Sequence, residues 1–446
     1  MRARHRTIPG VSMRRCWRRA GMNRRSEEFE RVVSGGDPFG ILAPLSVTEL
    51  RALVRALARE SERASGPLEA AAGLAATFER WRAREFPPRE RVIARIAERS
   101  GKSPELLGES LDALLQPFTA DALYAFARRI RGRLSGVGAF VMPANVPGAG
   151  LHELVGAIIA GASALIKVSS REPFFFTEFA ASLDEIAPAL GARAKAVVFA
   201  RENFKLAAAM LESSDFAVVL GADETLSGLH CPRPFFGFGS RASGAFVTQS
   251  ALEKSSPETV AALARDLTLF EQQGCLSPHH IFLECADPAA AARFGESMAE
   301  ALSTLAQRLG PARLSFEAAC AIRRVRESAR WQRLGGRSVM LWEGSAMAWT
   351  VVMDPDARFR LSPGHRTVTI TPVASLGVFE QRLAPMRGKL EAFSVTAGSP
   401  SADLAARLLE GLGVTWICEP GSMQSPPLEW RHGGGAFLDF VTGATR

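Results

Sequence analysis

Between residues 137 and 220 the chain alternates short apolar runs with longer stretches of helical periodicity. The apolar runs predict strands at 138–143, 164–168, 195–199 and 216–220. The stretches between them predict helices at 151–160, 174–187 and 204–212. This rhythm predicts a parallel sheet with helices on both faces, and ligands then bind beyond the carboxyl ends of the strands.

The flanking regions differ from this central part. Residues 27–133 read as helical; for example, Ser46 and Glu49 form an N-cap signal before leucines at helical spacing. Ser256 precedes a second long helix that runs toward residue 275, with Pro257 in its first turn. Strands are predicted at 245–247, 338–342, 349–353, 367–371 and 414–417, and helices at 288–309, 315–326, 376–386 and 402–412. These patterns predict a second α/β unit.

At 446 residues the chain is too long for one simple core, so several domains are expected. We expect a disordered basic tail at 1–25, a helical region at 26–134 and a dinucleotide-binding domain at 135–250. A catalytic domain is expected at 251–415 and a C-terminal return segment at 416–446.

The net charge of +8 arises in the first 25 residues, which carry nine arginines and no acid. Without them, 45 basic residues face 46 acidic ones, so composition gives no case for a nucleic-acid-binding surface. The basic head lacks the apolar core of a secretory signal. We interpret it as a tail or a start-site artefact in preference to a targeting segment, since Met13 and Met22 offer later starts. No apolar run approaches the ~18 residues of a membrane span.

The six cysteines show no CxxC pair and no paired Cys/His spacing. The pattern therefore suggests neither a metal site nor a disulfide framework, and it favours a reducing, cytoplasmic setting.

Cys275 lies on a predicted tight turn between a helical run ending at Gly274 and a strand beginning near His279. A thiol on such a turn is exposed and can lie near backbone N–H groups that favour the thiolate. The alternative is a small buried hydrophobic residue, which is the commoner role of a free cysteine.

Other polar residues follow predicted strands. The Asn145 side chain can donate to an oxyanion, although a turn role is the alternative. Lys167, Ser169 and Ser170 end the next strand and offer positive charge and hydroxyls where an acid would bind the ribose of NAD. This arrangement suits a 2′-phosphate; the alternative is a solvated strand end.

Residues Gly221 to Thr225 follow an apolar strand and open a helix, so their N–H groups can approach a pyrophosphate. Gly221 and Asp223 are the candidates in this segment. There is no GxGxxG and no GxxxxGK[ST], so the signal is weak alone.

Together these motifs resemble the aldehyde dehydrogenase superfamily, and within it the LuxC-like acyl-CoA reductases. The matching segments are Pro143-Ala144-Asn145-Val146-Pro147, Lys167-Val168-Ser169-Ser170, Gly221-Ala222-Asp223-Glu224-Thr225, the run from Glu271 to Pro278, and the tail segments Cys418 to Gly421 and Pro426 to His432. They cover roughly residues 130–440 in the family's order.

The resemblance implies an α/β fold with a parallel-sheet dinucleotide-binding domain, an α/β catalytic domain and a small oligomerisation element. It implies NADPH-dependent reduction of an acyl-CoA, or of an acyl group on a carrier protein, to the aldehyde. Cys275 would form the acyl-enzyme, and Asn145 with the Cys275 N–H would hold the oxyanion. A homo-oligomer is expected.

Three alternatives stay open: an NAD(P)-dependent aldehyde dehydrogenase, an acyl-phosphate reductase, and a non-catalytic acyl-binding partner. The hydrolytic glutamate of aldehyde dehydrogenases has no counterpart in residues 237–240, and Ser362-Pro363-Gly364 lies where an acid is expected to hold the nicotinamide ribose. His279 and His280 alternate on a strand, so at most one of them can supply a proton at the site. Packing or a surface position is the more common role for both. The phenylalanines at 174–176, 235, 236 and 238 are candidates for an acyl tunnel, or for core packing.

Overall fold

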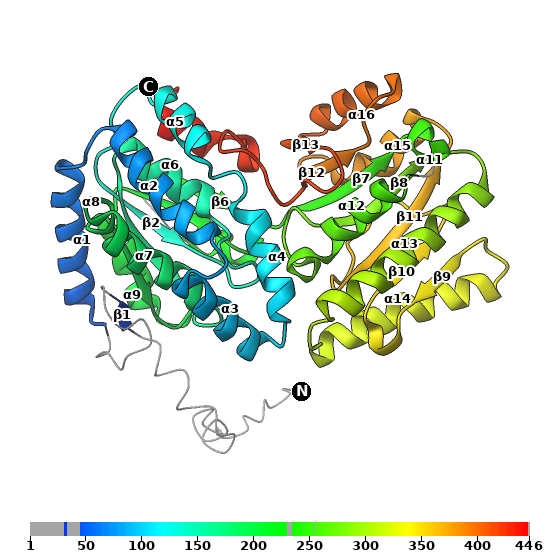
Figure 1. Ribbon diagram of the computed structural model, residues 1–446, viewed down its shortest axis with the longest axis horizontal. Coiled ribbons are helices and arrows are strands. Elements are labelled where there is room, and N and C mark those ends of the chain that lie inside the picture. The colour runs from blue at the N-terminus through cyan, green and yellow to red at the C-terminus, as the bar shows by residue number, and fades with distance from the viewer. Residues whose placement is uncertain (1–30, 34–44, 230–233, 255, 445–446) are drawn as a thin grey trace, which may run out of the picture.

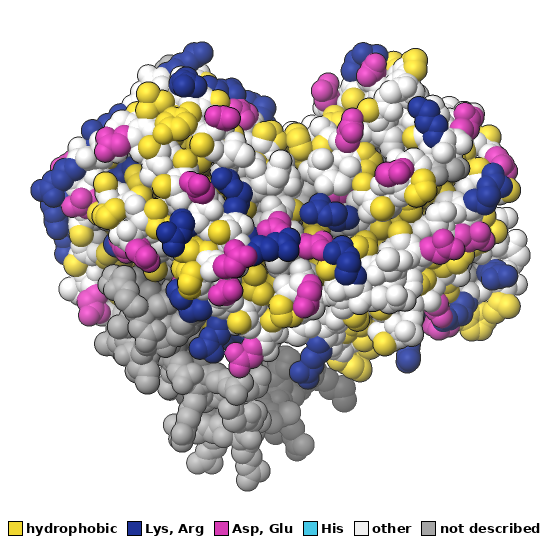
Figure 2. Space-filling view, in the orientation of Figure 1, with side chains coloured by type: hydrophobic (Ala, Val, Ile, Leu, Met, Phe, Trp, Pro, Cys, Tyr) yellow, Lys and Arg dark blue, Asp and Glu magenta, His cyan; other side chains and the backbone are white. Residues whose placement is uncertain are grey.

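Each half of the described chain is built on one sheet. The computed structural model describes residues 31–33, 45–229, 234–254 and 256–444. In Figure 1 the early part of the chain forms one lobe and the later part the other, with α4 (Pro104–Leu115) between them. Figure 2 shows a notch between the lobes, and the acidic and basic side chains on this face are interspersed.

The first sheet has the strand order β1-β4-β3-β2-β5-β6 among the described residues. All neighbouring strands are parallel except β1, which pairs antiparallel with β4. Its strands are β1 (Arg31–Val33), β2 (Val137–Val141), β3 (Ser163–Val168), β4 (Ala194–Val198), β5 (Phe216–Leu220) and β6 (Phe235–Phe238).

The second sheet has the order β13-β12-β7-β8-β11-β10-β9 in the same part of the chain. It is parallel except for the edge strand β9, which pairs antiparallel with β10. Its strands are β7 (Ala242–Val247), β8 (Pro278–Glu284), β9 (Met340–Glu343), β10 (Thr350–Met353), β11 (Thr367–Val373), β12 (Leu390–Val395) and β13 (Trp416–Cys418).

Helices cover both faces of each sheet. The remaining helices are α1 (Val47–Glu62), α2 (Pro67–Arg82), α3 (Pro87–Ser100), α5 (Ala120–Arg129), α6 (Leu151–Ala160), α7 (Phe174–Ile186), α8 (Pro188–Gly191), α9 (Phe204–Ser213), α10 (Asp223–Ser227), α11 (Gln249–Lys254), α12 (Pro257–Thr268), α13 (Pro288–Leu309), α14 (Phe316–Leu334), α15 (Leu376–Leu383), α16 (Pro400–Gly411) and α17 (Ala436–Thr442), with short 3-10 turns η3 (Leu269–Gln272), η4 (Ser345–Met347), η5 (Ala384–Met386) and η6 (His432–Gly434). No helix of the described residues is both long and apolar enough to cross a bilayer.

Alternation along the strands of the first sheet produces two cores. One face of β3 contributes Ile166 to a large core with α2, α6 and α7, and the other face contributes Leu165 to a core with α1 and α9. In β8, Ile281 packs toward α12 and α13, whereas Phe282 packs toward α15. Both sheets are therefore buried on two faces, as expected for parallel sheets.

The C-terminal segment returns from the second sheet to the first. After β13 the chain crosses between the lobes, and α17 packs beside α6 (Figure 1). Phe437 and Val441 of α17 enter the large core of the first lobe. The segment between β13 and α17 therefore lies against α6 at the junction of the lobes, although the two are distant in the sequence.

Most of the predicted elements are confirmed. The helix at 151–160 and the strand at 216–220 have the predicted bounds, and Ser46 and Glu49 form a capping box. The prediction that residues 27–133 are helical is wrong at β1, a strand formed by pairing with β4. β6, β12 and α17 were not predicted. The expected basic tail lies outside the described residues, and the domain boundaries stay predictions; β7 already belongs to the second sheet although it precedes residue 250.

Asp266 of α12 ties the returning segment to the second lobe. Its carboxylate is fully buried, one oxygen accepts the Gly421 N–H at 2.6 Å, and the other has no partner among the described residues. Burial raises the pKa of Asp266 to about 7, although the Gly421 N–H and Arg265 partly oppose this shift. An ionised Asp266 is therefore costly in the folded protein near neutral pH.

We predict that Asp266→Asn removes part of the pH dependence of stability. Because the folded pKa lies above the unfolded value, Asp266 lowers the free energy of unfolding as pH rises from about 4 to about 7, by about 1.4 kcal/mol per pKa unit. Urea denaturation of both proteins at pH 5 and pH 8 measures the effect. At pH 8 the free energy of unfolding of the variant should be higher, relative to wild type, than it is at pH 5. Equal pH slopes for the two proteins would contradict the assignment.

Candidate active site

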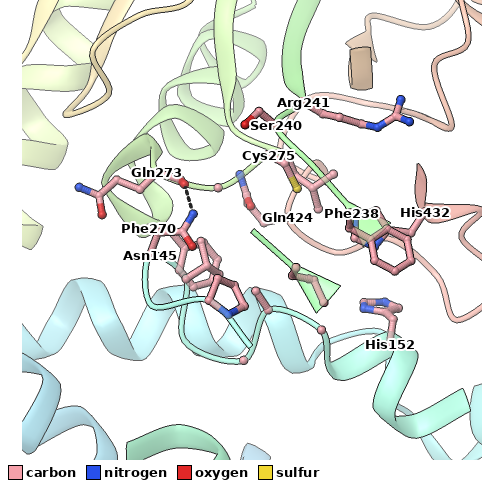
Figure 3. Close-up of a pocket in the computed structure, with 18 of the residues that line it drawn as sticks. Asn145, His152, Phe238, Ser240, Arg241, Phe270, Gln273, Cys275, Gln424 and His432 are labelled. Carbon is pink, nitrogen blue, oxygen red and sulfur yellow. Dashed lines mark hydrogen bonds between the residues drawn. The ribbon is translucent and has the colours of Figure 1, made fainter. Parts of the chain in front are cut away.

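A pocket of about 470 Å³ lies where the two lobes meet. It is lined by Leu114, Pro143, Asn145, Val146, Gly148, Ala149, Gly150, His152, Glu153, Leu220, Gly221, Ala222, Phe238, Gly239, Ser240, Arg241, Phe270, Gln272, Gln273, Gly274, Cys275, Leu276, His279, Gln424, Pro426, Trp430 and His432. Figure 3 shows Cys275 between Asn145 on one side and the Phe238–His432 pair on the other. Of the predicted site residues, Asn145, Gly221 and Cys275 line this pocket.

Cys275 lies on the turn that the sequence predicted. The Ser277 N–H closes this turn by donating to the Gly274 carbonyl at 3.1 Å, and β8 begins at Pro278. The thiol is free and half-buried. The Ser243 hydroxyl donates to the Cys275 carbonyl at 2.5 Å, which holds the turn against β7. The Cys275 N–H donates to no acceptor among the described residues, so it is available to a bound group.

The segment just before Cys275 has an unusual backbone. Phe270, Glu271 and Gln272 all have φ between 54° and 57°, in the left-handed region that non-glycine residues rarely adopt. Such strain persists only where surrounding contacts hold it. Three consecutive residues in this conformation turn the chain sharply from α12 into the turn that carries Cys275.

The Gln272 carboxamide supplies much of this restraint. Its nitrogen donates to the carbonyls of Pro278 at 2.7 Å and Thr367 at 2.8 Å, and its oxygen accepts the Thr367 N–H at 2.8 Å. All three groups are buried. The side chain therefore joins the segment before Cys275 to the starts of β8 and β11.

Glu271 adds a buried ion pair. Its carboxylate accepts from Arg366 at 2.6 Å, and both side chains are almost fully buried. The His365 N–H donates to the Glu271 carbonyl at 2.9 Å. His365 and Arg366 also have left-handed backbone, with φ of 53° and 55°, so two strained segments brace each other.

Asn145 is held by the same loop. Its side-chain nitrogen donates one hydrogen bond to the Gln273 carbonyl at 2.7 Å. A carboxamide nitrogen carries two hydrogens, so the second remains for a ligand. Asn145 and Cys275 both line the pocket, and their role as an oxyanion site stays a prediction.

The two histidines of β8 lie on opposite faces, as predicted. His279 lines the pocket, but its Nδ1 accepts the Ser362 N–H at 3.2 Å, and burial lowers its pKa to about 4. His280 is buried in the core, where its Nε2 lies 2.9 Å from the Thr371 hydroxyl, and burial lowers its pKa to about 3. Both rings are therefore neutral at pH 7.

A third histidine, His432, lies in the pocket beside Cys275. Its Nδ1 is 2.7 Å from a carboxylate oxygen of Glu153, a buried acid in the first turn of α6. Burial lowers the pKa of His432, but the Glu153 carboxylate and a side-chain hydrogen bond with Cys275 outweigh it and raise the pKa to about 10. The sequence analysis assigned no role to either residue. The available signal was an acid at position 153 within an otherwise apolar helix.

The remaining predicted residues surround the carboxyl ends of β3 and β5. Lys167 lies outside the pocket lining; burial lowers the pKa of its amine, Glu202 opposes the shift and Arg201 adds to it. Its ammonium lies 5.4 Å from the centre of the Phe199 ring. The Ser169 hydroxyl accepts the Arg171 N–H at 3.2 Å, and the Ser170 carbonyl accepts from Arg99 at 2.9 Å.

Asp223 has a structural partner. Its carboxylate accepts the Ser240 N–H at 2.8 Å, and a Cβ at Gly239 would come within 2.2 Å of it. Asp223 thus holds the loop that follows β6 against α10. Direct contact of Asp223 with a cofactor stays a prediction.

Most of the phenylalanines that were candidates for an acyl tunnel pack in the core instead, which was the alternative. Phe175, Phe176 and the neighbouring Phe174 are buried in the core of the first lobe, away from the pocket lining. Phe236 packs against Phe437 and Phe440. Phe238 is the member of the set that lines the pocket.

Solved structures of similar fold are aldehyde dehydrogenases and related oxidoreductases. An oxidoreductase from Marinobacter aquaeolei is 15% identical, with a TM-score of 0.66 over 89% of this chain and 88% of that one. Aldehyde dehydrogenase 21 from Physcomitrella patens, solved with succinate, is 15% identical with a TM-score of 0.65 over 90% and 88%. An NADP-dependent enzyme from E. coli is 15% identical with a TM-score of 0.64 over 88% and 87%. The fold is that of the aldehyde dehydrogenase superfamily.

Comparison of the sequence with family profiles identifies a particular family. The family profile described as "Acyl-CoA reductase (LuxC)" matches residues 132–442, a span that contains both sheets apart from β1. No curated protein sequence matches the chain. The chain belongs to the LuxC acyl-CoA reductase family, and it is an NAD(P)-dependent enzyme of acyl reduction.

We predict that Arg366→Met destabilises the segment before Cys275. Removing one partner of a buried ion pair leaves the Glu271 charge uncompensated, which typically costs about 3–5 kcal/mol. Urea denaturation measures the loss. The double variant Glu271→Gln/Arg366→Met, which leaves no buried charge, should recover much of it. A single variant no less stable than the double would contradict the role of the pair.

Proposed function

We propose that the protein reduces an acyl-CoA to the aldehyde with NADPH, through a thioester on Cys275. The observation that carries the proposal is the placement of the Cys275 thiol beside two free N–H donors in a pocket between the lobes. A thioester carbonyl accepts hydride far more readily than a carboxylate does. This chemistry agrees with the family to which the chain belongs.

The acylation step follows from the site. The Cys275 sulfur, as thiolate, attacks the thioester carbonyl and forms a carbon–sulfur bond. The carbonyl oxygen then carries negative charge, which the Asn145 N–H and the Cys275 N–H stabilise. The bond to the CoA sulfur breaks and its electron pair leaves with CoA. NADPH, when bound, supplies the hydride that reduces the acyl group. The bond to Cys275 then breaks, and its electron pair returns to the sulfur as aldehyde is released.

Hydrolysis of the acyl-enzyme is disfavoured. Gly237 and Phe238 end β6, and Gly239 and Ser240 follow it, so this loop brings no carboxylate to the pocket. Among the described residues that line the pocket, Glu153 is the one acid, and it is engaged with His432. The site therefore supports acyl-CoA reduction better than the alternative function, oxidation of an aldehyde to a carboxylic acid.

The residues at the ends of β3 and β4 fit a dinucleotide that carries a 2′-phosphate. Lys167 and Arg201 are close enough to influence each other's charge, and positions 169 and 170 hold hydroxyls where an acid would exclude a phosphate. The carboxylate of Glu202, which is next to Arg201, partly offsets the positive charge of Lys167 and Arg201. Arg201 donates to the Thr225 hydroxyl at 3.1 Å, which links the ends of β4 and β5.

The acyl group has an apolar path to Cys275. Leu114, Val146, Phe270, Pro426 and Trp430 contribute to the lining of the pocket. These side chains favour a hydrocarbon chain over a charged substrate. CoA as the carrier, a homo-oligomeric state and a cytoplasmic setting that keeps the thiol reduced belong to the same proposal.

We predict that Cys275→Ala abolishes acyl-CoA-dependent NADPH oxidation, because no other thiol lines the pocket in the described structure. NADPH absorbance is followed with acyl-CoA of several chain lengths, and with NADH for comparison. Cys320→Ala is the matched control, since Cys320 is exposed on α14. Turnover by the Cys275 variant would overturn the proposed acyl-enzyme.

We predict that Asn145→Ala lowers kcat about 100- to 1,000-fold with a small change in KM, because an oxyanion donor acts in the transition state. The Asn145 side chain also binds the Gln273 carbonyl, so loop integrity needs its own measurement. Alkylation of Cys275 by iodoacetamide forms no oxyanion, and its rate should stay within a few-fold of wild type. An unchanged kcat would exclude Asn145 from the oxyanion site.

A further inference from the structure

The proposed reaction consumes one proton, and its donor has to lie near the leaving sulfur. A thioester, a hydride and a proton together yield an aldehyde and a thiol. The departing CoA thiolate takes the proton, whereas the Cys275 thiolate is regenerated without one. A group beside Cys275 that carries a proton at neutral pH meets this need.

His432 is held rigidly next to Cys275. Its ring stacks between Phe238, with centroids 4.1 Å apart and an interplanar angle of 18°, and Trp430, at 4.2 Å and 19°. Its Nδ1 is fixed by Glu153 at 2.7 Å. The ring can neither tilt nor rotate freely, so its other nitrogen keeps one direction. Figure 3 shows the stacked Phe238 and His432 rings on the Cys275 side of the pocket.

The charges around His432 favour the imidazolium ring. Glu153 has a pKa below its ordinary value; burial alone would raise it, but the charge and hydrogen bond of His432 outweigh burial. His152, also on α6, is neutral at pH 7 because burial lowers its pKa, and its Nε2 lies 2.9 Å from the Pro426 carbonyl. On the segment of His432 itself, the Gly433 N–H donates to Glu391, whose charge is paired with Arg241. Glu153 and Cys275 are therefore the groups that set the charge of His432.

The other described histidines do not meet the requirement. His279 presents a neutral ring held by Ser362, and His280 is sealed in the core. His365 lies outside the pocket lining and faces Gln273, with 3.4 Å between their nitrogens. Among the histidines that the structure describes, His432 combines a place beside Cys275 with a buried carboxylate partner, and the others do not.

We propose that His432 is the acid that protonates the departing thiolate of the acyl carrier, and that Glu153 is the residue that positions it. This inference rests on the proposed function. The reacting form of Cys275 is the thiolate, as in the proposed function, and the imidazolium ring lies beside it in the pocket. As the Cys275 sulfur bonds to the acyl carbon, the carbon–sulfur bond to the carrier breaks and its electron pair takes the proton from His432. The carrier leaves as a thiol, and the neutral ring regains a proton from water before the next turnover.

The same contacts explain why the proton is released at the right moment. The Cys275 sulfur is one of the groups that raise the pKa of His432. Acylation converts the thiolate into a neutral thioester, so the imidazolium ring loses one of the charges that favour it as the new bond forms. Attack by Cys275 and release of the proton are therefore coupled through one electrostatic contact.

The test compares acylation with two leaving groups, without NADPH. Full-length protein is mixed with a long-chain acyl-CoA or with the matching aryl thioester, whose thiolate is a weak base and departs without a proton. Release of one equivalent of thiol is followed by stopped flow for wild type, His432→Gln and Glu153→Gln. With acyl-CoA, His432→Gln should acylate on the order of 100-fold more slowly. With the aryl thioester the loss should be at least about tenfold smaller.

Each outcome separates the two proposals. An equal loss with both substrates would remove His432 from proton donation and leave it a structural or thiolate-stabilising role. Unchanged acylation of His432→Gln would overturn the inference, while the wild-type burst would still support the Cys275 acyl-enzyme. Absence of a wild-type burst with either thioester would overturn the proposed function itself. Acylation of His432→Gln by the aryl thioester also shows that the variant is folded.

Glu153→Gln tests positioning. Because the carboxylate helps to raise the pKa of His432 to about 10, its loss should move the alkaline fall in the acylation rate to lower pH. If Glu153 had only a structural role, its loss would lower the acylation rate without shifting the pH at which the rate falls. His279→Gln is the matched histidine control, and it should leave the ratio of the two leaving groups unchanged. A changed ratio in that variant would assign the proton to His279 instead.

Discussion

The site depends on the Gln272 carboxamide. Three consecutive residues shortly before Cys275 adopt left-handed backbone, a conformation that costs of order 1 kcal/mol or more at each non-glycine residue. Gln272 opposes this cost with three buried hydrogen bonds to β8 and β11. Without this anchor the turn of Cys275 would relax away from the pocket. Asn145 depends on it too, since the amide of Asn145 is oriented by the next carbonyl along the chain.

The pocket contains two buried charged side chains, and either of them without the other would destabilise the fold. Glu153 and His432 are both buried, and an isolated buried ion is strongly destabilising. As a pair at 2.7 Å they stabilise each other, and the flanking rings of Phe238 and Trp430 exclude water from them. The Glu271–Arg366 pair has the same form but lies behind the loop that carries Cys275, away from the pocket lining. One buried pair therefore serves the proposed chemistry, and the other supports the backbone.

Local sequence predicted the elements well where periodicity and length agreed. The strand at 216–220 is a continuous apolar run, and its buried position in a parallel sheet requires such a run. β12 was missed because its residues Leu390–Val395 include Glu391, a buried acid whose partner Arg241 is distant in the sequence. α17 was missed because three glycines precede it, and its apolar face packs on α6, β5 and β6, which are all distant in the sequence.

The sequence by itself determined the α/β class, the turn that carries Cys275 and the family. These features are local, because each is a short motif whose residues lie within a few positions of one another. Only the tertiary structure decided that Glu153 and His432, 279 positions apart, share a hydrogen bond beside Cys275. That contact requires the chain after β13 to cross back to α6, and no local periodicity records such a crossing. The turn of Cys275 is therefore recognisable from sequence, whereas its neighbour His432 is recognisable only after the two lobes are assembled.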